Sequence, residues 1–138
     1  MDHRKIFLLL SLVLGLSVNH GSAFAEDAKP THTTESLESV KKAVQSGKAI
    51  LLDVREQAEW DNGHLKDAKF LPTSEITKSK GEAFFKLGLD KKQVVYTHCG
   101  AGGRALRIAT MLKEKGYDVR ALKPGFDELL DAGFPEAK

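Results

Sequence analysis

The chain has 138 residues, of which 41% are hydrophobic and 29% are charged, a size and composition typical of one soluble globular domain. Its net charge of +2 is too small for the basic surface that nucleic-acid binding requires. The single cysteine excludes an internal disulfide and a zinc site built from several cysteines.

The first 25 residues have the three-part pattern of a secretory signal peptide. Arg4 and Lys5 precede an apolar run over residues 6–18, and AFA at residues 23–25 offers a cleavage site with small residues at both ends. The apolar run has about 13 residues, fewer than the ~20 that a helix needs to span a bilayer. We therefore expect a signal peptide that is cleaved after residue 25, rather than a permanent membrane anchor.

Cleavage at that point would leave a tail over residues 26–34 and one domain over residues 35–138. In a bacterial cell this predicts a periplasmic protein, and no later segment is long and apolar enough to attach the mature chain to a membrane. A lone cysteine in that oxidising compartment has no internal partner and is open to mixed disulfides. Its presence there favours a function that uses its reactivity.

Helical and strand patterns alternate through the domain. AILLDV at residues 49–54, for example, is typical of a strand buried on both faces. In chain order the patterns predict a helix over 36–45, a strand over 49–54, a short helix over 56–61, a strand over 69–71, partial helix over 74–85, a strand over 94–97, a helix over 105–115, a strand over 117–122 and a helix over 126–131. This alternation predicts an α/β fold with a central parallel sheet and helices on both faces.

The stretch VVYTHCGAGGR at residues 94–104 places Cys99 between a strand and a helix. The residues that follow are small and end at a cation: Gly100, Ala101, Gly102, Gly103 and Arg104. Without bulky side chains, backbone N–H groups can turn inward and form an anion-binding concavity, to which the following helix adds its positive end. A thiol there is expected to be partly ionised, the nucleophilic form, and Arg104 would attract an anionic substrate. A buried structural cysteine beside a tight turn is the alternative.

Asp53 and Arg55 end a neighbouring predicted strand. Ligands of parallel sheets bind beyond the carboxyl ends of the strands, so we expect this pair to share one rim with Cys99. Alternation places both side chains on the same side of the strand. An internal ion pair, with Glu59 as a further candidate member, is a better interpretation than direct contact with a substrate.

The histidines carry weaker signals. His98 should point to the sheet face opposite the Cys99 sulfur, because adjacent residues of a strand alternate, so we expect a buried structural side chain rather than a base. His64 and Trp60 are expected to have structural roles, Trp60 within the core, and His32 belongs to no pattern. One cysteine with scattered histidines predicts no metal site, and we expect no cofactor.

Three stretches resemble the rhodanese domain. They are LLDVREQAEWDNGHLKDAKFLP at residues 51–72, the cysteine loop, and KGYDVRALKPGF at residues 115–126. The resemblance covers nearly all of the expected mature chain and is strongest to small, single-domain exported members. It implies a rhodanese-like fold, a parallel sheet with flanking helices, and sulfurtransferase activity through a cysteine persulfide. Asp53 and Arg55 match the family's strand-end pair.

The length of the loop distinguishes two chemistries within this resemblance. Family sulfurtransferases have six residues from the cysteine to the arginine, as Cys99–Arg104 has, whereas related phosphatases have one more. This favours sulfur transfer over a phosphatase or arsenate reductase, and a partner-binding module with an incidental cysteine is a third hypothesis. Gly100 stands where a basic or polar residue is common, which puts the preferred donor in doubt. Further departures, which concern packing more than chemistry, are Asp67, Pro124 and Leu129.

The expected reaction has two halves. Cys99 would take the outer sulfur of thiosulfate or a similar small anionic donor, releasing sulfite, and then pass it to cyanide or to a thiol, which could belong to a protein. Backbone N–H groups from Gly100 to Arg104 would hold the persulfide. We expect a monomer.

Overall fold

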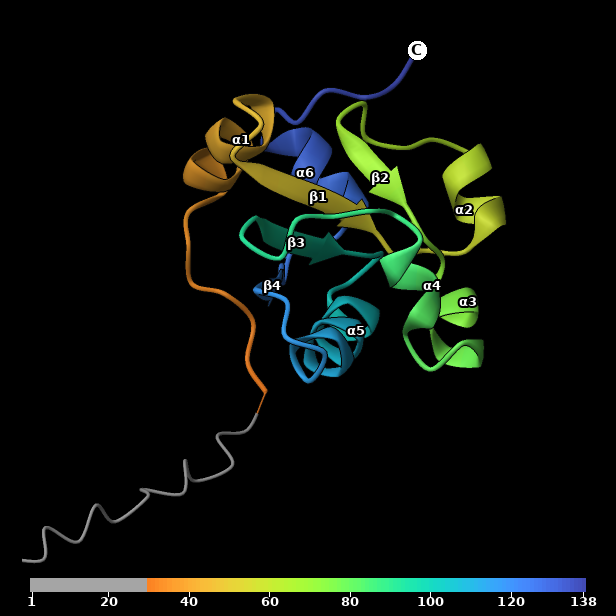
Figure 1. Ribbon diagram of the computed structural model, residues 1–138. Helices are drawn as coiled ribbons and strands as arrows, with labels where there is room; N and C mark the ends of the chain where they lie inside the picture. Colours follow the sequence, from red (N-terminus) through yellow and green to blue (C-terminus); the bar gives the residue numbers. More distant parts are fainter. Residues whose placement is uncertain (1–29) are drawn as a thin grey trace, which may run out of the picture.

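The computed structural model describes residues 30–138, and the expected signal peptide at 1–25 lies outside them. Four parallel strands form one sheet in the order β2-β1-β3-β4 (Figure 1). The strands are β1 (Ala49–Asp53), β2 (Ala68–Phe70), β3 (Val94–His98) and β4 (Val119–Ala121). The helices are α1 (Leu37–Gln45), α2 (Gln57–Asp61), α3 (Thr73–Lys78), α4 (Glu82–Phe85), α5 (Gly103–Lys113) and α6 (Phe126–Asp131). The predicted α/β fold is confirmed.

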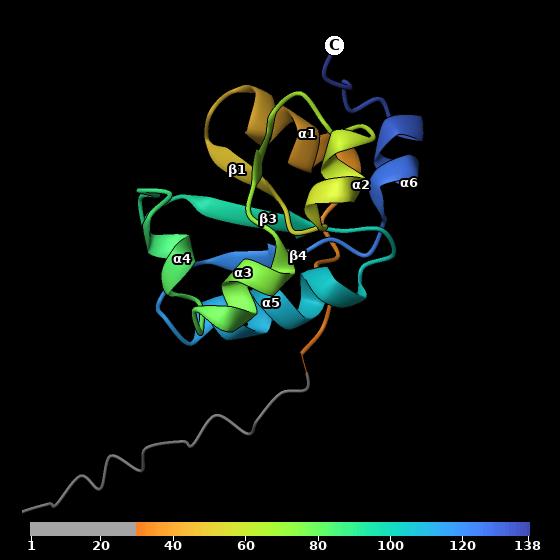
Figure 2. The ribbon, with the colours of Figure 1, turned by 90° about the vertical axis from the view of Figure 1, so that its right-hand side faces the viewer.

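Helices cover both faces of the sheet. In Figures 1 and 2, α3, α4 and α5 lie on one side of it, and α1 and α6 lie on the other. Each face has its own buried cluster because side chains alternate along the strands. Leu52 and Val95 belong to the cluster on the α5 side, whereas Leu51 and Tyr96 belong to the cluster on the α1 side. Cys99 belongs to the α5 side.

Several predicted bounds differ from the observed ones, most clearly those of two helical segments and of the strand predicted over 117–122, which spans only Val119–Ala121. The segment expected to be partly helical, 74–85, forms two helices, because Gly81 adopts a left-handed conformation at φ 86° and begins α4 there. The helix expected over 105–115 begins two residues earlier, at Gly103, and ends at Lys113.

The sequence predicted Trp60 within the core, and this prediction is wrong, because the indole is only partly buried. The helix that carries it, α2, has no buried residue. Its indole instead stacks on the ring of His64, with centroids 3.7 Å apart and planes 9° apart, and also on Phe70. The side of α2 that faces the sheet edge is therefore held by ring stacking on half-buried neighbours.

The start of the described chain is attached to β4. The N–H of Thr33 donates to the carbonyl of Ala121 at 2.9 Å, and Arg120 pairs with Glu35 at 2.6 Å. The hydroxyl of Tyr96 donates to the same carboxylate. Within residues 30–138, none of the helices has the length and apolar character of a membrane span.

Candidate active site

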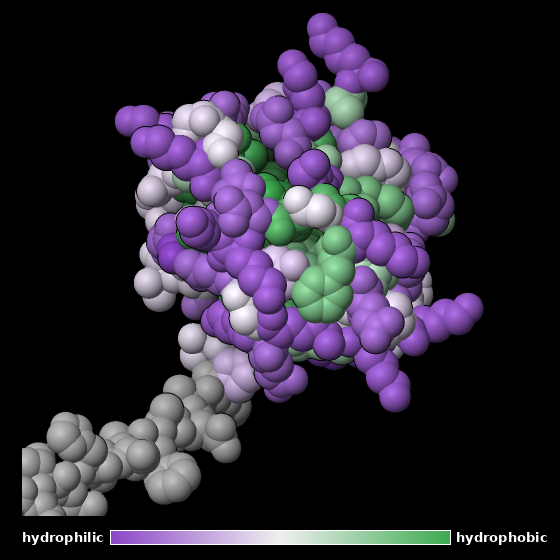
Figure 3. Space-filling view, in the orientation of Figure 1, coloured by the Kyte–Doolittle hydropathy of each residue, from purple (hydrophilic) through white to green (hydrophobic). Residues whose placement is uncertain are grey.

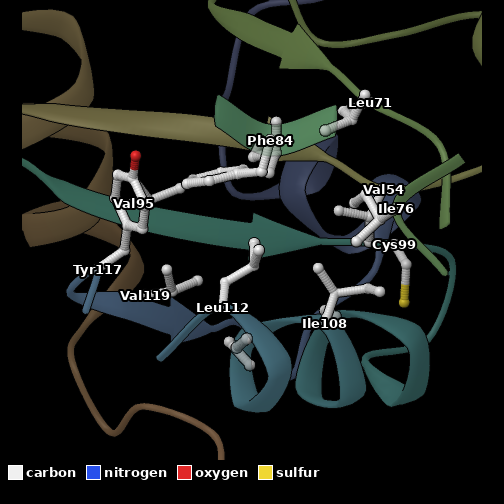
Figure 4. Packing of buried hydrophobic residues seen from close by; sticks show 14 of the residues in the cluster. Val54, Leu71, Ile76, Phe84, Val95, Cys99, Ile108, Leu112, Tyr117 and Val119 are labelled. Atoms are coloured by element: carbon white, nitrogen blue, oxygen red, sulfur yellow. The ribbon is translucent and has the colours of Figure 1, made fainter. Parts of the chain in front are cut away.

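Cys99 directly follows β3 and points toward the first turn of α5. Its side chain lies beside Val54 and Ile76 and above Ile108 (Figure 4), and only 1% of its surface is exposed. The N–H of Gly102 donates to Sγ at 3.1 Å. The sulfur therefore lies at the boundary between the apolar core and the backbone dipoles of the loop.

Two glycines allow three segments to meet at this loop. Gly102, at φ 84°, is the N-cap of α5, and a Cβ there would lie 2.6 Å from the carbonyl oxygen of Lys123. A Cβ on Gly125 would overlap the carbonyl oxygen of Gly100. On the third side, Nε2 of His32 lies 3.0 Å from the carbonyl oxygen of Gly102. The cysteine loop is thus packed between the turn at 123–125 and the N-terminal segment.

Arg104 is already paired in the structure. Its Nη1 and Nη2 atoms donate to the two oxygens of Glu59 at 2.6 and 2.8 Å. These bonds hold the pKa of the Glu59 carboxyl at about 2, below its ordinary value of 4.5. The same bonds raise the pKa of Arg104, and the nearby Cys99 side chain raises it further by a smaller amount. The cation that the sequence assigns to an anionic substrate is balanced by a carboxylate.

Asp53 and Arg55 form the predicted ion pair at the end of β1. Nη2 of Arg55 lies 2.8 Å from Oδ2 of Asp53 and also donates to the carbonyl of Gly63. The guanidinium carbon lies 4.1 Å from the centroid of the Phe126 ring. Glu59, the further candidate member of this pair, is hydrogen bonded to Arg104 instead.

His98 lies beside Asp53, on the sheet face opposite Cys99, as strand alternation predicts. Its Nε2 is 3.6 Å from Oδ2 of Asp53, and neither ring nitrogen has a hydrogen-bond partner within residues 30–138. Burial lowers the pKa of His98 to about 4, and the Asp53 carboxylate opposes only part of that shift. The imidazole is therefore neutral at pH 7 and structural in character.

A cavity of about 220 Å³ adjoins the loop. Its lining residues come from the ends of β1 and β3 and the two helices that flank them: Arg55, Glu59, Asn62, Gly63, Gly100, Phe126 and Asp127. Arg55, the one cation in this lining, is paired with Asp53. Among the residues that the structure describes, no group of three or more His, Cys, Asp or Glu side chains is placed to hold a metal ion.

The sequence did not predict three contacts of the site. The partner of Arg104 lies 45 residues away along the chain, and His32 reaches the loop from a segment that was expected to be a tail. The third contact is that of Gly125 with the carbonyl of Gly100. The small size of Gly125 was the one available signal, because a glycine that precedes a helix also fits close backbone approach.

The model of the family described as "Rhodanese-like domain" matches residues 36–132. The chain belongs to the rhodanese-like domain family. Within that family, this rhodanese-like domain is 30% identical over 83 residues to a Bacillus subtilis protein named "Putative sulfur carrier protein YrkF". It is 36% identical over 70 residues to a Mycobacterium tuberculosis protein named "Probable adenylyltransferase/sulfurtransferase MoeZ".

Each of these two matches covers only part of this chain and only part of the relative. They cover 59% and 51% of this chain, but only 42% and 17% of the two relatives. A solved structure of a rhodanese-related protein from Thermoplasma volcanium superposes with a TM-score of 0.60 at 20% identity, and the match covers 73% of this chain and 93% of that one. That likeness shows that this rhodanese-like domain has the fold of its family.

Proposed function

We propose that this domain is a sulfurtransferase that carries a sulfane sulfur as a persulfide on Cys99. The observation that carries the proposal is the N–H of Gly102, which donates to Sγ at the start of a six-residue loop between β3 and α5. A donor aimed at sulfur stabilises the negative charge that a thiolate or persulfide bears, as preorganised dipoles do in oxyanion holes. The names of the two relatives, a sulfur carrier and a sulfurtransferase, support the same chemistry.

The reaction is a double displacement at sulfur. The Cys99 thiolate attacks the outer sulfur of thiosulfate or a similar donor, the S–S bond of the donor breaks, and sulfite leaves with the bonding electron pair. Cyanide or a thiolate then attacks the outer sulfur of the persulfide and regenerates the Cys99 thiolate. No external oxidant or reductant is consumed, because each S–S bond that breaks is replaced by a new bond to the transferred sulfur.

The proposed place of this chemistry is the periplasm, with the mature chain acting as a monomer. The basic, apolar and small-residue pattern of residues 1–25 supports export.

The test is the intact mass of the mature protein after incubation with several sulfane donors. We expect the wild type to gain the mass of one sulfur atom and the Cys99→Ser variant to gain none. A wild-type protein that takes up sulfur from no donor contradicts the proposal. Hydrolysis of an aryl phosphate that depends on Cys99 would instead indicate the phosphatase alternative.

Burial of the Cys99 thiol favours one second candidate, a partner-binding module in which the cysteine packs in the core. The two functions differ in their need for the sulfur. A strain that carries Cys99→Ala should resemble the deletion strain if the domain transfers sulfur, and the wild-type strain if it only binds a partner.

A further inference from the structure

The charge of Arg104 is engaged by a carboxylate that is itself held in place. Glu59 lies in the first turn of α2, where its Oε2 atom also accepts the N–H of Glu56 at 2.9 Å. A guanidinium that binds both oxygens of a carboxylate forms one of the strongest side-chain ion pairs. A substrate anion that needs Arg104 must therefore displace a preorganised competitor.

Gly100 lies directly against this pair. A Cβ on Gly100 would be 3.3 Å from Nη2 of Arg104 and 3.8 Å from Oε1 of Glu59. The loop therefore supplies no second cation at this position, from which a side chain would reach the carboxylate.

The adjoining cavity has an acidic lining. Asp127 contributes a carboxylate that has no ion-pair partner within residues 30–138, whereas Glu59 is paired with Arg104 and the one lining cation, Arg55, is paired with Asp53 at 2.8 Å. Within residues 30–138, the cavity thus has no lining cation free of a carboxylate partner. A dianion that approaches the loop meets like charge, which costs binding energy and slows encounter.

We propose that Glu59 sets the donor specificity of the site and makes it favour thiol persulfides over thiosulfate. This inference rests on the sulfur-transfer function proposed above. A thiol persulfide, R–S–SH, carries at most one negative charge at its sulfur atoms, whereas thiosulfate carries two. The Cys99 thiolate attacks the outer sulfur of R–S–SH, the S–S bond breaks, and R–S⁻ leaves, so that the proton and the outer sulfur stay on Cys99.

The experiment measures the rate of persulfide loading at Cys99 by intact mass, with thiosulfate and with the persulfide of 2-mercaptoethanol, which has an uncharged tail. The wild type should load faster from the persulfide. Glu59→Gln frees Arg104 and removes one carboxylate, so thiosulfate loading should rise about tenfold, through a lower KM, while persulfide loading changes little. Gln also serves as the third residue of a capping box, which preserves α2.

Asp61→Asn is the matched control, because it removes an exposed carboxylate of the same helix that does not touch Arg104. It should leave both rates unchanged. Glu59→Asp keeps the charge and should keep most of the preference for the persulfide, a rescue that a purely structural role of Glu59 would not produce.

Gly100→Lys gives an independent variant in case Glu59→Gln does not fold. A lysine there reaches Oε1 of Glu59 and competes with Arg104, so thiosulfate loading should again rise. A wild type that loads equally well from both donors would contradict the role of Glu59 in donor specificity, and so would variants that leave the ratio of the two rates unchanged. Neither result would contradict the proposed sulfur transfer. A wild type that loads from neither donor would overturn the proposed function together with the role of Glu59.

Discussion

The buried His98 should make the stability of the domain fall between pH 6.5 and pH 4. Its pKa is lowered from 6.5 to about 4 by burial, so the unfolded chain binds a proton in this range that the folded chain does not. Since the unfolded state binds more protons there, the free energy of unfolding increases as the pH rises and decreases as the pH falls. A shift of this size corresponds to a loss of about 3 kcal/mol from pH 7 to pH 4, at ~1.4 kcal/mol for each pKa unit.

The perturbation that isolates this effect is His98→Leu, which replaces the imidazole by an apolar side chain of similar volume. Urea unfolding followed by circular dichroism at several pH values between 7 and 4 gives the free energy of each protein. The carboxyl groups titrate in both proteins, so the difference between the two curves reports His98. The variant should be less sensitive to pH by about 3 kcal/mol over this range. Parallel curves for the two proteins would refute the neutral, buried state of His98.

Three further outcomes follow from the packing and charge of the loop. Gly125→Ala should destabilise the domain by about 2 kcal/mol or more in urea unfolding, because its Cβ overlaps a loop carbonyl, whereas Gly103→Ala, where a Cβ has open space, should be nearly neutral. His32→Ala removes the contact with the carbonyl of Gly102 and should make Cys99 react faster with iodoacetamide at fixed pH, and an unchanged rate would show that the N-terminal segment does not hold the loop. Raising the salt concentration should increase thiosulfate loading relative to persulfide loading, because ions screen charges beyond about 8 Å at 0.15 M.

The elements that the sequence predicted well are those whose structure follows from the residues within them. The runs at 49–54 and 94–97 are apolar apart from Asp53 and Thr97, and both form central strands of the sheet. The last helix was predicted with its observed bounds, Phe126–Asp131. The meeting of Asp53 and Arg55 also followed from local information, because residues two apart on one strand share a face.

The contacts that were not predictable depend on which distant segments meet. Glu59 has the same local pattern whether it pairs with Arg55 nearby or with Arg104, and only the placement of α2 against the loop decides between them. Trp60 was expected in the core, but α2 lies at the sheet edge, where stacking replaces burial. Burial of the Cys99 thiol likewise depends on Ile76 of α3, which the chain order does not place over the loop.

Apolar side chains form only a small part of the surface seen in Figure 3. The face seen in Figure 3 is largely hydrophilic, with a small apolar area near its centre. Phe85 is the one large hydrophobic residue of the described chain that is clearly exposed, at 43%.

The stacking of Trp60 gives the protein a built-in optical probe. It is the only tryptophan of the chain, it is adjacent to Glu59, and its ring lies flat against an imidazole. Any event that separates Glu59 from Arg104 and shifts the short helix changes the surroundings of that indole. Binding of an anion that displaces Glu59 from Arg104 can thus be followed by intrinsic fluorescence in real time, without a label and without consuming the thiol.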